Sequence, residues 1–267
     1  MAGRLGILAC GGALPVRIAE AVPEAMRLAL EGVPTEVEDV EAHRIEKIGG
    51  LFDAMRAGGV TRVVFAGGLA RPPLDPTQFD ATMMQVAPRL MGALQGGDDA
   101  LLRAVIDVFE DQGFEVIGAH EVLPDLVAKA GHLAGPEPSA QDLRDTERAF
   151  DILSALSPVD VGQGCAVAGG LCLGIETLQG TDAILRFVGE TPEALRRGQT
   201  GVYVKAAKRG QDLRVDMPAV GPATIEAVSA AGLAGLVIEA GRVMVLEREA
   251  TVAKAEALGV FLTARDA

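Results

Sequence analysis

The chain opens with the stretch L-G-I-L-A-C-G-G-A-L-P-V-R-I-A-E-A-V at residues 5–22. Residues 5–9 form a short apolar run typical of a buried strand, and residues 16–22 carry the spacing of a helix. A strand, a glycine turn and a helix are how a nucleotide-binding α/β domain begins. The stretch lacks the full G-x-G-x-x-G fingerprint, so it does not by itself indicate NAD. Gly11 and Gly12 form either a plain tight turn or a turn whose backbone N–H groups approach a nucleotide or phosphate.

A second apolar run ends in a similar turn. Residues 60–66 read V-T-R-V-V-F-A, a β-branched pattern that predicts a strand, and Gly67 and Gly68 follow directly. Ligands of an open parallel sheet bind beyond the carboxyl ends of its strands. Gly67, Gly68 and the nearby Arg71 are therefore candidates for ligand binding, although Arg71 also fits a surface arginine in a proline-rich loop.

A third strand is predicted at residues 114–117, and His120 and Glu121 follow it. A lone histidine at such a position is more often structural than catalytic. The alternation of strands with helical patterns predicts an α/β fold whose N-terminal domain is a Rossmann-like parallel sheet.

Asp98 and Asp99 precede a helix predicted at residues 100–112. Aspartates in this position are good N-caps, which is a purely structural role. Paired carboxylates also supply the oxygen ligands that Mg²⁺ prefers. The sequence leaves both interpretations open.

The second half is predicted to be a mixed α/β domain. Residues 134–141 read A-G-P-E-P-S-A-Q and form the best candidate linker, which gives domains at 1–133 and 142–267. Apolar runs flank Gly169-Gly170 and indicate a tight hairpin. A second hairpin is predicted from the runs at 236–239 and 243–246. Gly180-Thr181-Asp182 is expected to cap a helix at 183–188.

A local excess of positive charge stands out because the whole chain has a formal net charge of −13. One acid, Asp212, lies among six basic residues: Arg196, Arg197, Lys205, Lys208, Arg209 and Arg214. Lys and Arg supply charge-assisted donors to anionic oxygens. Gly221-Pro222 then begins a predicted helix, whose free N–H groups also suit phosphate. The run is either a phosphate site or a solvated charged loop.

Composition excludes several classes of protein. Aromatic residues make up only 3% of the chain and its charge is negative, so the footprint of a nucleic-acid-binding protein is absent. Three cysteines are too few for a disulfide scaffold and fit a reducing cytoplasm. No apolar run approaches the ~20 residues of a membrane-spanning helix, so any membrane contact is expected to be peripheral.

Several motifs together resemble those of the LpxI family, UDP-2,3-diacylglucosamine pyrophosphatases of lipid A synthesis. The resemblance extends over nearly the full chain. It rests on G-G-A-L-P at 11–15, G-D-D-A-L-L-R-A-V at 97–105, G-A-H-E-V-L-P at 118–124, D-V-G-Q at 160–163, G-T-D-A at 180–183, Q-D-L-R at 211–214, and Asp216, Pro218 and Gly221-Pro222. It implies a Mg²⁺-dependent hydrolase that splits UDP-2,3-diacylglucosamine into UMP and 2,3-diacylglucosamine 1-phosphate, known as lipid X.

The resemblance and the residue patterns together give a set of candidate site residues. The catalytic candidates are Asp212, Lys208 and the position of Ala223. The candidates for substrate binding are Gly11, Gly12, Gly67, Gly68, Arg71, Asp98, Gln163, Thr181, Asp182, Lys205, Arg214 and Thr224. The candidates for metal binding are Asp98, Asp99 and Glu121, with further carboxylates at Glu176, Asp182, Asp212 and Asp216.

Ala223 departs from the family pattern, which usually reads G-P-D-T where this chain reads G-P-A-T. Ala219 stands where the family usually has threonine. An acid at position 223 would lie at a helix N-terminus facing the phosphates, where it could bind the metal or orient water. Because alanine can do neither, we expect a catalytically impaired hydrolase.

Two other functions stay open. The first is a protein that binds a nucleotide-sugar lipid without hydrolysing it, which Ala223 also fits. The second is a nucleotide-dependent oxidoreductase, disfavoured by the missing fingerprint and ribose-binding acid. The resemblance further implies peripheral association with the inner face of the inner membrane, and a homodimer is a candidate assembly.

Overall fold

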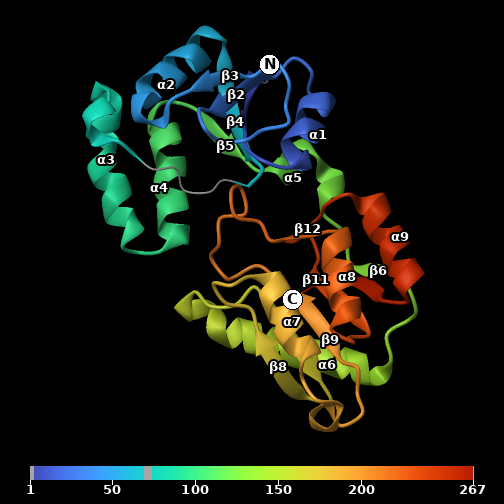
Figure 1. Cartoon of the computed structure of the whole chain (residues 1–267). Coiled ribbons are helices and arrows are strands. Elements are labelled where there is room, and N and C mark those ends of the chain that lie inside the picture. The colour runs from blue at the N-terminus through green and yellow to red at the C-terminus, as the bar shows by residue number, and fades with distance from the viewer. Residues whose placement is uncertain (1–2, 69–73, 267) are drawn as a thin grey trace. The chain divides into compact units, whose positions relative to one another are not determined.

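The computed structural model describes residues 3–68 and 74–266, and the chain in this part divides into two compact units (Figure 1). Unit 1 comprises Met1–Pro124 together with Asp212–Asp216, and unit 2 comprises Asp125–Gln211 and Met217–Ala267. The division therefore falls after Pro124 rather than in the predicted linker. Residues 135–139 of that linker connect a strand to a helix inside unit 2.

Unit 1 is built around a parallel sheet. Its described strands and α-helices are β1 (Arg4–Ala9), α1 (Ala13–Ala21), β2 (Met26–Leu30), β3 (Glu41–His43), α2 (Ile48–Ala57), β4 (Val60–Ala66), α3 (Ala81–Leu94), α4 (Asp98–Asp111), β5 (Glu115–Ile117) and α5 (Ala119–Val122). The strand order is β3-β2-β1-β4-β5, and every pairing is parallel. This arrangement confirms the predicted Rossmann-like domain.

Helices cover both faces of this sheet. Leu8 and Val63 contribute to a core cluster with Phe52 of α2 and Phe109 of α4, while α1 packs against β1 on the opposite face (Figure 1). The strand order reverses between β1 and β4, because β2 and β3 lie on one side of β1 and β5 lies beyond β4. Such a reversal is the position where ligands bind in open α/β sheets.

Unit 2 has a mixed sheet, as predicted. Its described strands and α-helices are β6 (Gly131–Ala134), α6 (Ala140–Leu156), β7 (Gly164–Ala168), β8 (Leu171–Ile175), α7 (Thr181–Gly189), β9 (Val202–Lys205), β10 (Ala219–Val220), α8 (Pro222–Ala230), β11 (Gly235–Glu239), β12 (Met244–Val245), α9 (Arg248–Leu258) and β13 (Phe261–Arg265). The main sheet has the order β6-β13-β11-β9-β7-β8, and β10 pairs with β12 separately.

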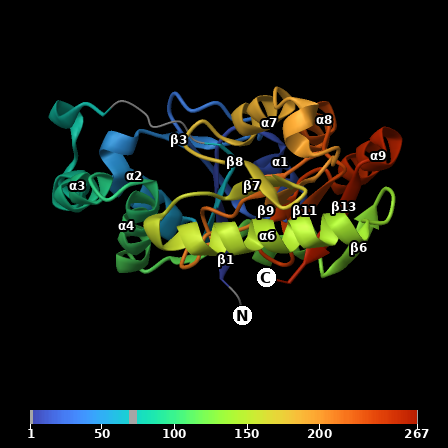
Figure 2. The same ribbon diagram turned by 90° about the horizontal axis from the view of Figure 1, so that it is seen from below.

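Alternate side chains of the central strands enter two different cores. Val202 and Val204 of β9 pack with Leu153 of α6, whereas Tyr203 packs with Leu185 of α7 and with residues of α8 and α9. Figure 2 shows α6 on one side of this sheet and α7 and α8 on the other. Lys205 is two residues after Tyr203, so the period of two places it on the α7 side.

The two predicted hairpins have different outcomes. β7 and β8 form the first one, with Gly169 and Gly170 both at positive φ in the turn. The second is wrong: β11 pairs in parallel with β9 and β13, and β12 pairs with β10. β11 is buried along its whole length. A continuous apolar run of this kind is typical of a central parallel strand, and it does not identify the neighbouring strands.

Two helices begin earlier than predicted. α4 begins at Asp98 with Gly97 as N-cap, and α7 begins at Thr181 with Gly180 as N-cap. Asp98, Asp99 and Asp182 therefore lie in first turns and are not N-cap residues. Gly97 and Gly180 adopt φ values of 95° and 82°, which glycine reaches without strain, and acids in a first turn are favoured by the helix dipole.

Within the described ranges, no helix combines the length and the apolar character needed to cross a bilayer.

Candidate functional site

The glycines predicted at the ends of β1 and β4 meet at the reversal of the strand order. Gly11 N–H donates to the carbonyl oxygen of Gly68 at 3.2 Å, and Gly68 N–H donates to that of Gly11 at 2.9 Å. Gly67 has a φ of 95°, and a Cβ there would lie 2.4 Å from the Gly11 carbonyl oxygen. This close approach of two backbones explains why both strands end in glycine.

The N-terminus of α1 begins at the same place. Its N-cap is Gly12, with a φ of 96°, and no described side chain caps it by a hydrogen bond. The first turn contains no acid. Uncapped N–H groups and the positive end of the helix dipole favour an anion, and phosphate is a frequent ligand of such termini.

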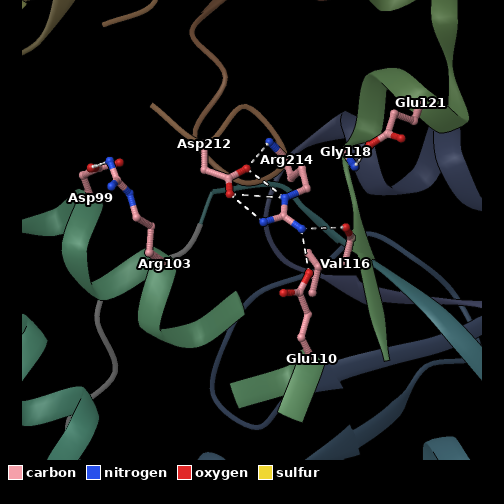
Figure 3. A network of polar contacts seen from close by, with 8 residues as sticks. All are labelled: Asp99, Arg103, Glu110, Val116, Gly118, Glu121, Asp212 and Arg214. Carbon is pink, nitrogen blue, oxygen red and sulfur yellow. Dashed lines mark hydrogen bonds and ion pairs between the residues drawn. The ribbon is translucent and has the colours of Figure 1, made fainter. Parts of the chain in front are cut away.

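Arg214 and Asp212 of the basic run belong to unit 1. Arg214 Nη2 donates to Asp212 Oδ2 at 2.7 Å, and its Nε donates to Asp212 Oδ1 at 3.0 Å. Nη1 pairs with Glu110 Oε1 of α4 at 2.7 Å and approaches the Val116 carbonyl oxygen of β5 at 3.4 Å (Figure 3). The guanidinium therefore fastens the 212–216 segment to α4 and β5.

These contacts also set the charge state of the pair. The hydrogen bonds from Arg214 lower the pKa of Asp212, against a smaller opposing effect of burial. The hydrogen bond with Asp212 in turn raises the pKa of Arg214. Asp212 is consequently a stable carboxylate at neutral pH, and its first role in the structure is to orient Arg214.

The end of β5 lies against the 212–216 segment. A Cβ at Gly118 would lie 3.3 Å from Cα of Arg214 and 2.4 Å from the His120 ring. The Glu121 carboxylate accepts the Gly118 N–H at 2.7 Å through Oε1 (Figure 3). His120 Nδ1 is buried, and it has no hydrogen-bond partner among the described residues. A small residue is thus required where β5 ends.

Those predicted metal ligands whose side chains the structure describes do not form a preassembled cluster. In the part of the chain that the structure describes, no three His, Cys, Asp or Glu side chains are grouped to hold a metal ion. Asp99 is instead ion-paired with Arg103, one turn along α4 (Figure 3). Asp98 lies in the first turn of α4, but its side chain is outside the described part of the structure, as is the whole of Arg71.

Unit 2 contains a buried polar cluster beneath α7. Lys205 Nζ contacts Glu176 Oε2 at 2.7 Å and Oε1 at 2.9 Å, and it donates to Thr181 Oγ1 at 2.7 Å. Tyr203 donates its hydroxyl to Glu176 Oε2 at 2.6 Å. The side chains of Lys205 and Glu176 are only 5% and 11% exposed. Burial and the neighbouring Glu176 carboxylate raise the pKa of Tyr203 well above its usual range.

Glycine makes room for this cluster too. A Cβ at Gly164 would lie 1.9 Å from the Tyr203 hydroxyl oxygen and 2.6 Å from Glu176 Oε2. Gln163 precedes it, and its carbonyl oxygen accepts the N–H of Ala206 at 2.9 Å. The structure therefore brings the predicted residues Thr181 and Lys205 together at Glu176. Gln163 is next to the cluster in the chain, and its described contact is this backbone hydrogen bond.

Two further cations of the basic run, Lys208 and Arg196, also have protein partners. Lys208 Nζ pairs with Asp160 at 2.5 Å, and Asp160 is more than half exposed. Arg196 is buried and donates to the carbonyl oxygens of Val188 and Ala231. Arg209 is exposed. The run is thus not one continuous patch of cations, because several members have separate structural contacts.

Ala223 is exposed in the first turn of α8. The helix has Gly221 as N-cap and Pro222 at its first position, and Thr224 Oγ1 accepts the Gly221 N–H at 3.2 Å. The predicted helix start is confirmed. A carboxylate at position 223 would project from an exposed first turn, where the Thr224 and Ile225 N–H groups already donate to the Gly221 carbonyl oxygen.

Two partners in these networks were not identified by sequence reasoning. Glu110 lies in the last turn of α4, and its partner Arg214 is about a hundred residues further along the chain. Asp160 belongs to the D-V-G-Q motif, and its partner Lys208 is also distant in the sequence. Tyr203 is the one tyrosine of the chain and lies in a predicted strand, which is the signal that could have drawn attention to a buried hydroxyl.

Comparisons with known proteins identify the family. The family model of the LpxI N-terminal domain matches residues 4–126, and that of the LpxI C-terminal domain matches residues 129–263. The chain is also 41% identical, over 98% of its length and 98% of the relative's, to UDP-2,3-diacylglucosamine pyrophosphatase LpxI of Caulobacter vibrioides. The Rossmann-like and mixed α/β units agree with this two-domain match, and the chain belongs to the LpxI family.

Proposed function

We propose that this chain is a hydrolase that splits the diphosphate of UDP-2,3-diacylglucosamine into UMP and lipid X in lipid A biosynthesis. The observation that carries the proposal is the 41% identity, over 98% of both chains, to a relative named for this pyrophosphatase activity. The local geometry supports it, because glycine turns and a helix N-terminus without a described side-chain cap lie together in unit 1. These features suit the phosphates of a nucleotide.

We assign the nucleotide phosphate to Gly11, Gly12 and the start of α1. Lys208 is the cation of unit 2 that we assign to the diphosphate. Its ammonium is mostly covered, but the carboxylate of its partner Asp160 is 56% exposed, so water can take over the contacts of Asp160 when Lys208 turns to a phosphate. Lys205 would first have to leave Glu176 and Thr181. Its role in this proposal is to hold Thr181 and the first turn of α7 in place for the substrate.

The proposal includes Mg²⁺, which balances phosphate charge and helps to position an attacking water when it is bound. Mg²⁺ is commonly held by one or two carboxylates together with the phosphates of the substrate. The scattered carboxylates fit this mode better than a site made by protein alone. Asp99 contacts Arg103 through Oδ2 and Glu121 contacts Gly118 through Oε1. The second oxygen of either carboxylate, or Asp98, is the protein ligand that we propose.

Ala223 is expected to slow the chemical step. The cations and Thr224, which would bind the ground state, are retained. A carboxylate that acts mainly in the transition state lowers the rate more than the affinity when it is lost. We therefore propose a hydrolase with impaired turnover and preserved substrate binding.

A second candidate function is binding of the nucleotide-sugar lipid without hydrolysis, which Ala223 alone favours. Identification of products separates the two. The chain and its Ala223→Asp variant are incubated with UDP-2,3-diacylglucosamine and Mg²⁺, and the mixtures are analysed by mass spectrometry. UMP and lipid X in either reaction support hydrolysis. If both proteins bind the substrate and neither forms product, the result supports binding without hydrolysis.

The association with a membrane is proposed to be peripheral, on the inner face of the inner membrane, because the substrate carries two acyl chains. Exposed apolar side chains of α3, Met84, Met91 and Leu94, are the surface that we assign to this contact. A homodimer stays a prediction that sedimentation of the purified chain would test.

A further inference from the structure

Two of the three cysteines face each other across the β7–β8 hairpin. Cys165 lies in β7 and Cys172 in β8, and their Sγ atoms are 3.9 Å apart. The pairing register of the two strands shifts between Ala166 and Val167, and Cys172 is paired with Val167. The sequence distance between the cysteines is short and their strands are hydrogen-bonded, so the proximity is a property of the hairpin itself.

The two thiols have opposite environments. Cys165 is fully buried in the cluster that packs against α6, whereas Cys172 is exposed. The hydrogen bond between them and the N–H of Gly174 lower the pKa of Cys172 to about 6, against an opposing effect of burial. The same hydrogen bond, with burial, raises the pKa of Cys165. An accessible thiolate beside a protonated second thiol is the arrangement found in redox-sensing cysteine pairs.

We propose that Cys165 and Cys172 form a peroxide-oxidisable dithiol, a modification site separate from the hydrolytic function. Cys172 Sγ attacks one oxygen of hydrogen peroxide, the O–O bond breaks, and Cys172 becomes a sulfenic acid while the departing hydroxide is protonated to water. Cys165 Sγ then attacks Cys172 Sγ, the S–O bond breaks, and the Cys165 proton leaves with the hydroxide as a second water. Two thiols and one peroxide give one disulfide and two waters.

The third cysteine provides an internal control. Cys10 is buried at the end of β1 in unit 1, and burial raises its pKa. It therefore lacks both the exposure and the thiolate character of Cys172. In the reduced chain, Cys172 should react with iodoacetamide at neutral pH at least about tenfold faster than Cys10.

The test uses the full chain and needs no substrate. The reduced protein is treated with one equivalent of hydrogen peroxide, denatured, alkylated and mapped by mass spectrometry. We expect a peptide pair joined through Cys165 and Cys172 with Cys10 left alkylated, and reversal by dithiothreitol. The Cys10→Ser variant should form the same disulfide.

Two single variants make the proposal falsifiable. Cys172→Ser should retain two alkylatable thiols after the same treatment, and Cys165→Ala should stop at a Cys172 sulfenic acid that dimedone traps. Three alkylated cysteines in the treated wild-type chain would overturn the proposal. So would a Cys172 that only gains oxygen while Cys165 stays alkylatable, since that is simple surface oxidation.

Discussion

Lys205 and Glu176 show how one buried ion pair organises the first turn of α7. The ammonium contacts both carboxylate oxygens and Thr181, and Tyr203 adds its hydroxyl to the same carboxylate. A buried pair of this kind contributes little net stability compared with apolar residues, but loss of one partner leaves a charge without compensation. The pair is therefore expected to fix geometry more than to add stability.

This expectation gives a stability prediction for the pair. Glu176→Gln should lower the free energy of unfolding by about 3 kcal/mol, because the Lys205 ammonium stays buried without its counter-charge. The double variant Glu176→Gln/Lys205→Met should recover much of that loss, which is a coupling between contacting residues. Urea denaturation of the chain and both variants measures this. A cost below about 1 kcal/mol for Glu176→Gln would contradict the assigned burial of the pair.

Neighbouring glycines at the end of β4 give a matched pair of substitutions. Gly67→Ala places a Cβ 2.4 Å from the Gly11 carbonyl oxygen at a φ of 95°, whereas a Cβ at Gly68 meets no described atom within 4 Å. Gly67→Ala should cost about 2–4 kcal/mol of stability. Gly68→Ala should change stability by less than about 1 kcal/mol. Equal effects in denaturant titrations would show that the two backbones do not approach as described.

At the scale of residues, the sequence indicated charge but not its partners. The excess of cations between Arg196 and Arg214 was visible, yet Lys205 pairs with Glu176 and Lys208 with Asp160, residues distant in the chain. Partners of this kind depend on which strands are adjacent. That these cations bind the diphosphate therefore stays a prediction. The structure adds that a phosphate would have to displace Glu176 from Lys205 or Asp160 from Lys208.

Among the elements, predictions from local pattern succeeded where the signal was local. β1, β4 and the β7–β8 hairpin each combine an apolar run with a glycine turn, and the structure confirms them. The strands that pair with β11 and with β12 could not be predicted from local pattern. Parallel neighbours such as β9, β11 and β13 are separated in the sequence by helices, so no short turn marks their pairing. The helices α4 and α7 begin earlier than predicted because Gly97 and Gly180, and not the acids that follow them, are the N-cap residues.

The α3 helix carries the prediction for membrane contact. Met84 and Met91 are 66% and 65% exposed and lie two turns apart on the same side of the helix. The double variant Met84→Ser/Met91→Ser should reduce binding to vesicles doped with UDP-2,3-diacylglucosamine by several-fold in co-sedimentation, because apolar area drives interfacial binding. Leu178→Ser, at a 93% exposed loop position, is the control and should bind as the wild type does. Equal binding by all three proteins would exclude α3.

The 212–216 segment carries a prediction for pH dependence. Arg214 lowers the pKa of Asp212 in the folded chain below its usual value of about 4. The stabilisation is therefore complete above that value, and it is lost as the pH falls through the folded-state pKa. Hydrogen-exchange protection of β5 and of the segment, corrected for intrinsic rates, should therefore fall as the pH is lowered below about 4.

A variant reproduces this loss without acid. Asp212→Asn should lower the same protection at neutral pH, because it removes the charge that orients Arg214. Asp107→Asn, which removes an exposed partner of Arg89 on the same helix as Glu110, should leave it unchanged. Protection that is insensitive to both pH and Asp212→Asn would contradict the role of the pair.

For the whole molecule, the sequence predicted two α/β domains but not the path of the chain between them. The C-terminal family match covers residues 129–263, yet Asp212–Asp216 within it belong to unit 1. No local pattern marks this excursion, because its anchors, Glu110 and the Val116 carbonyl, lie about a hundred residues earlier in the chain. The resemblance identified Asp212 and Arg214 as candidate residues, but the sequence could not predict that they belong to unit 1.

The exposed position of Ala223 makes it a clean site for testing the proposed hydrolysis. Thr224 and Gly221 form the start of α8 without help from the Ala223 side chain, so Ala223→Asp should not disturb the fold. An acid in a first turn is stabilising by about 0.3–1 kcal/mol through the helix dipole. Changes in activity can then be attributed to the carboxylate.

The most direct test is the rate of UMP release from saturating UDP-2,3-diacylglucosamine with Mg²⁺, compared between the chain and Ala223→Asp. Restoring one positioning or electrostatic group is expected to raise kcat by about 10²–10³, with little change in substrate affinity. UMP and lipid X should appear in equal amounts. Equal rates for the two proteins would contradict the assignment of Ala223, and no release of UMP by either would contradict the proposed hydrolysis.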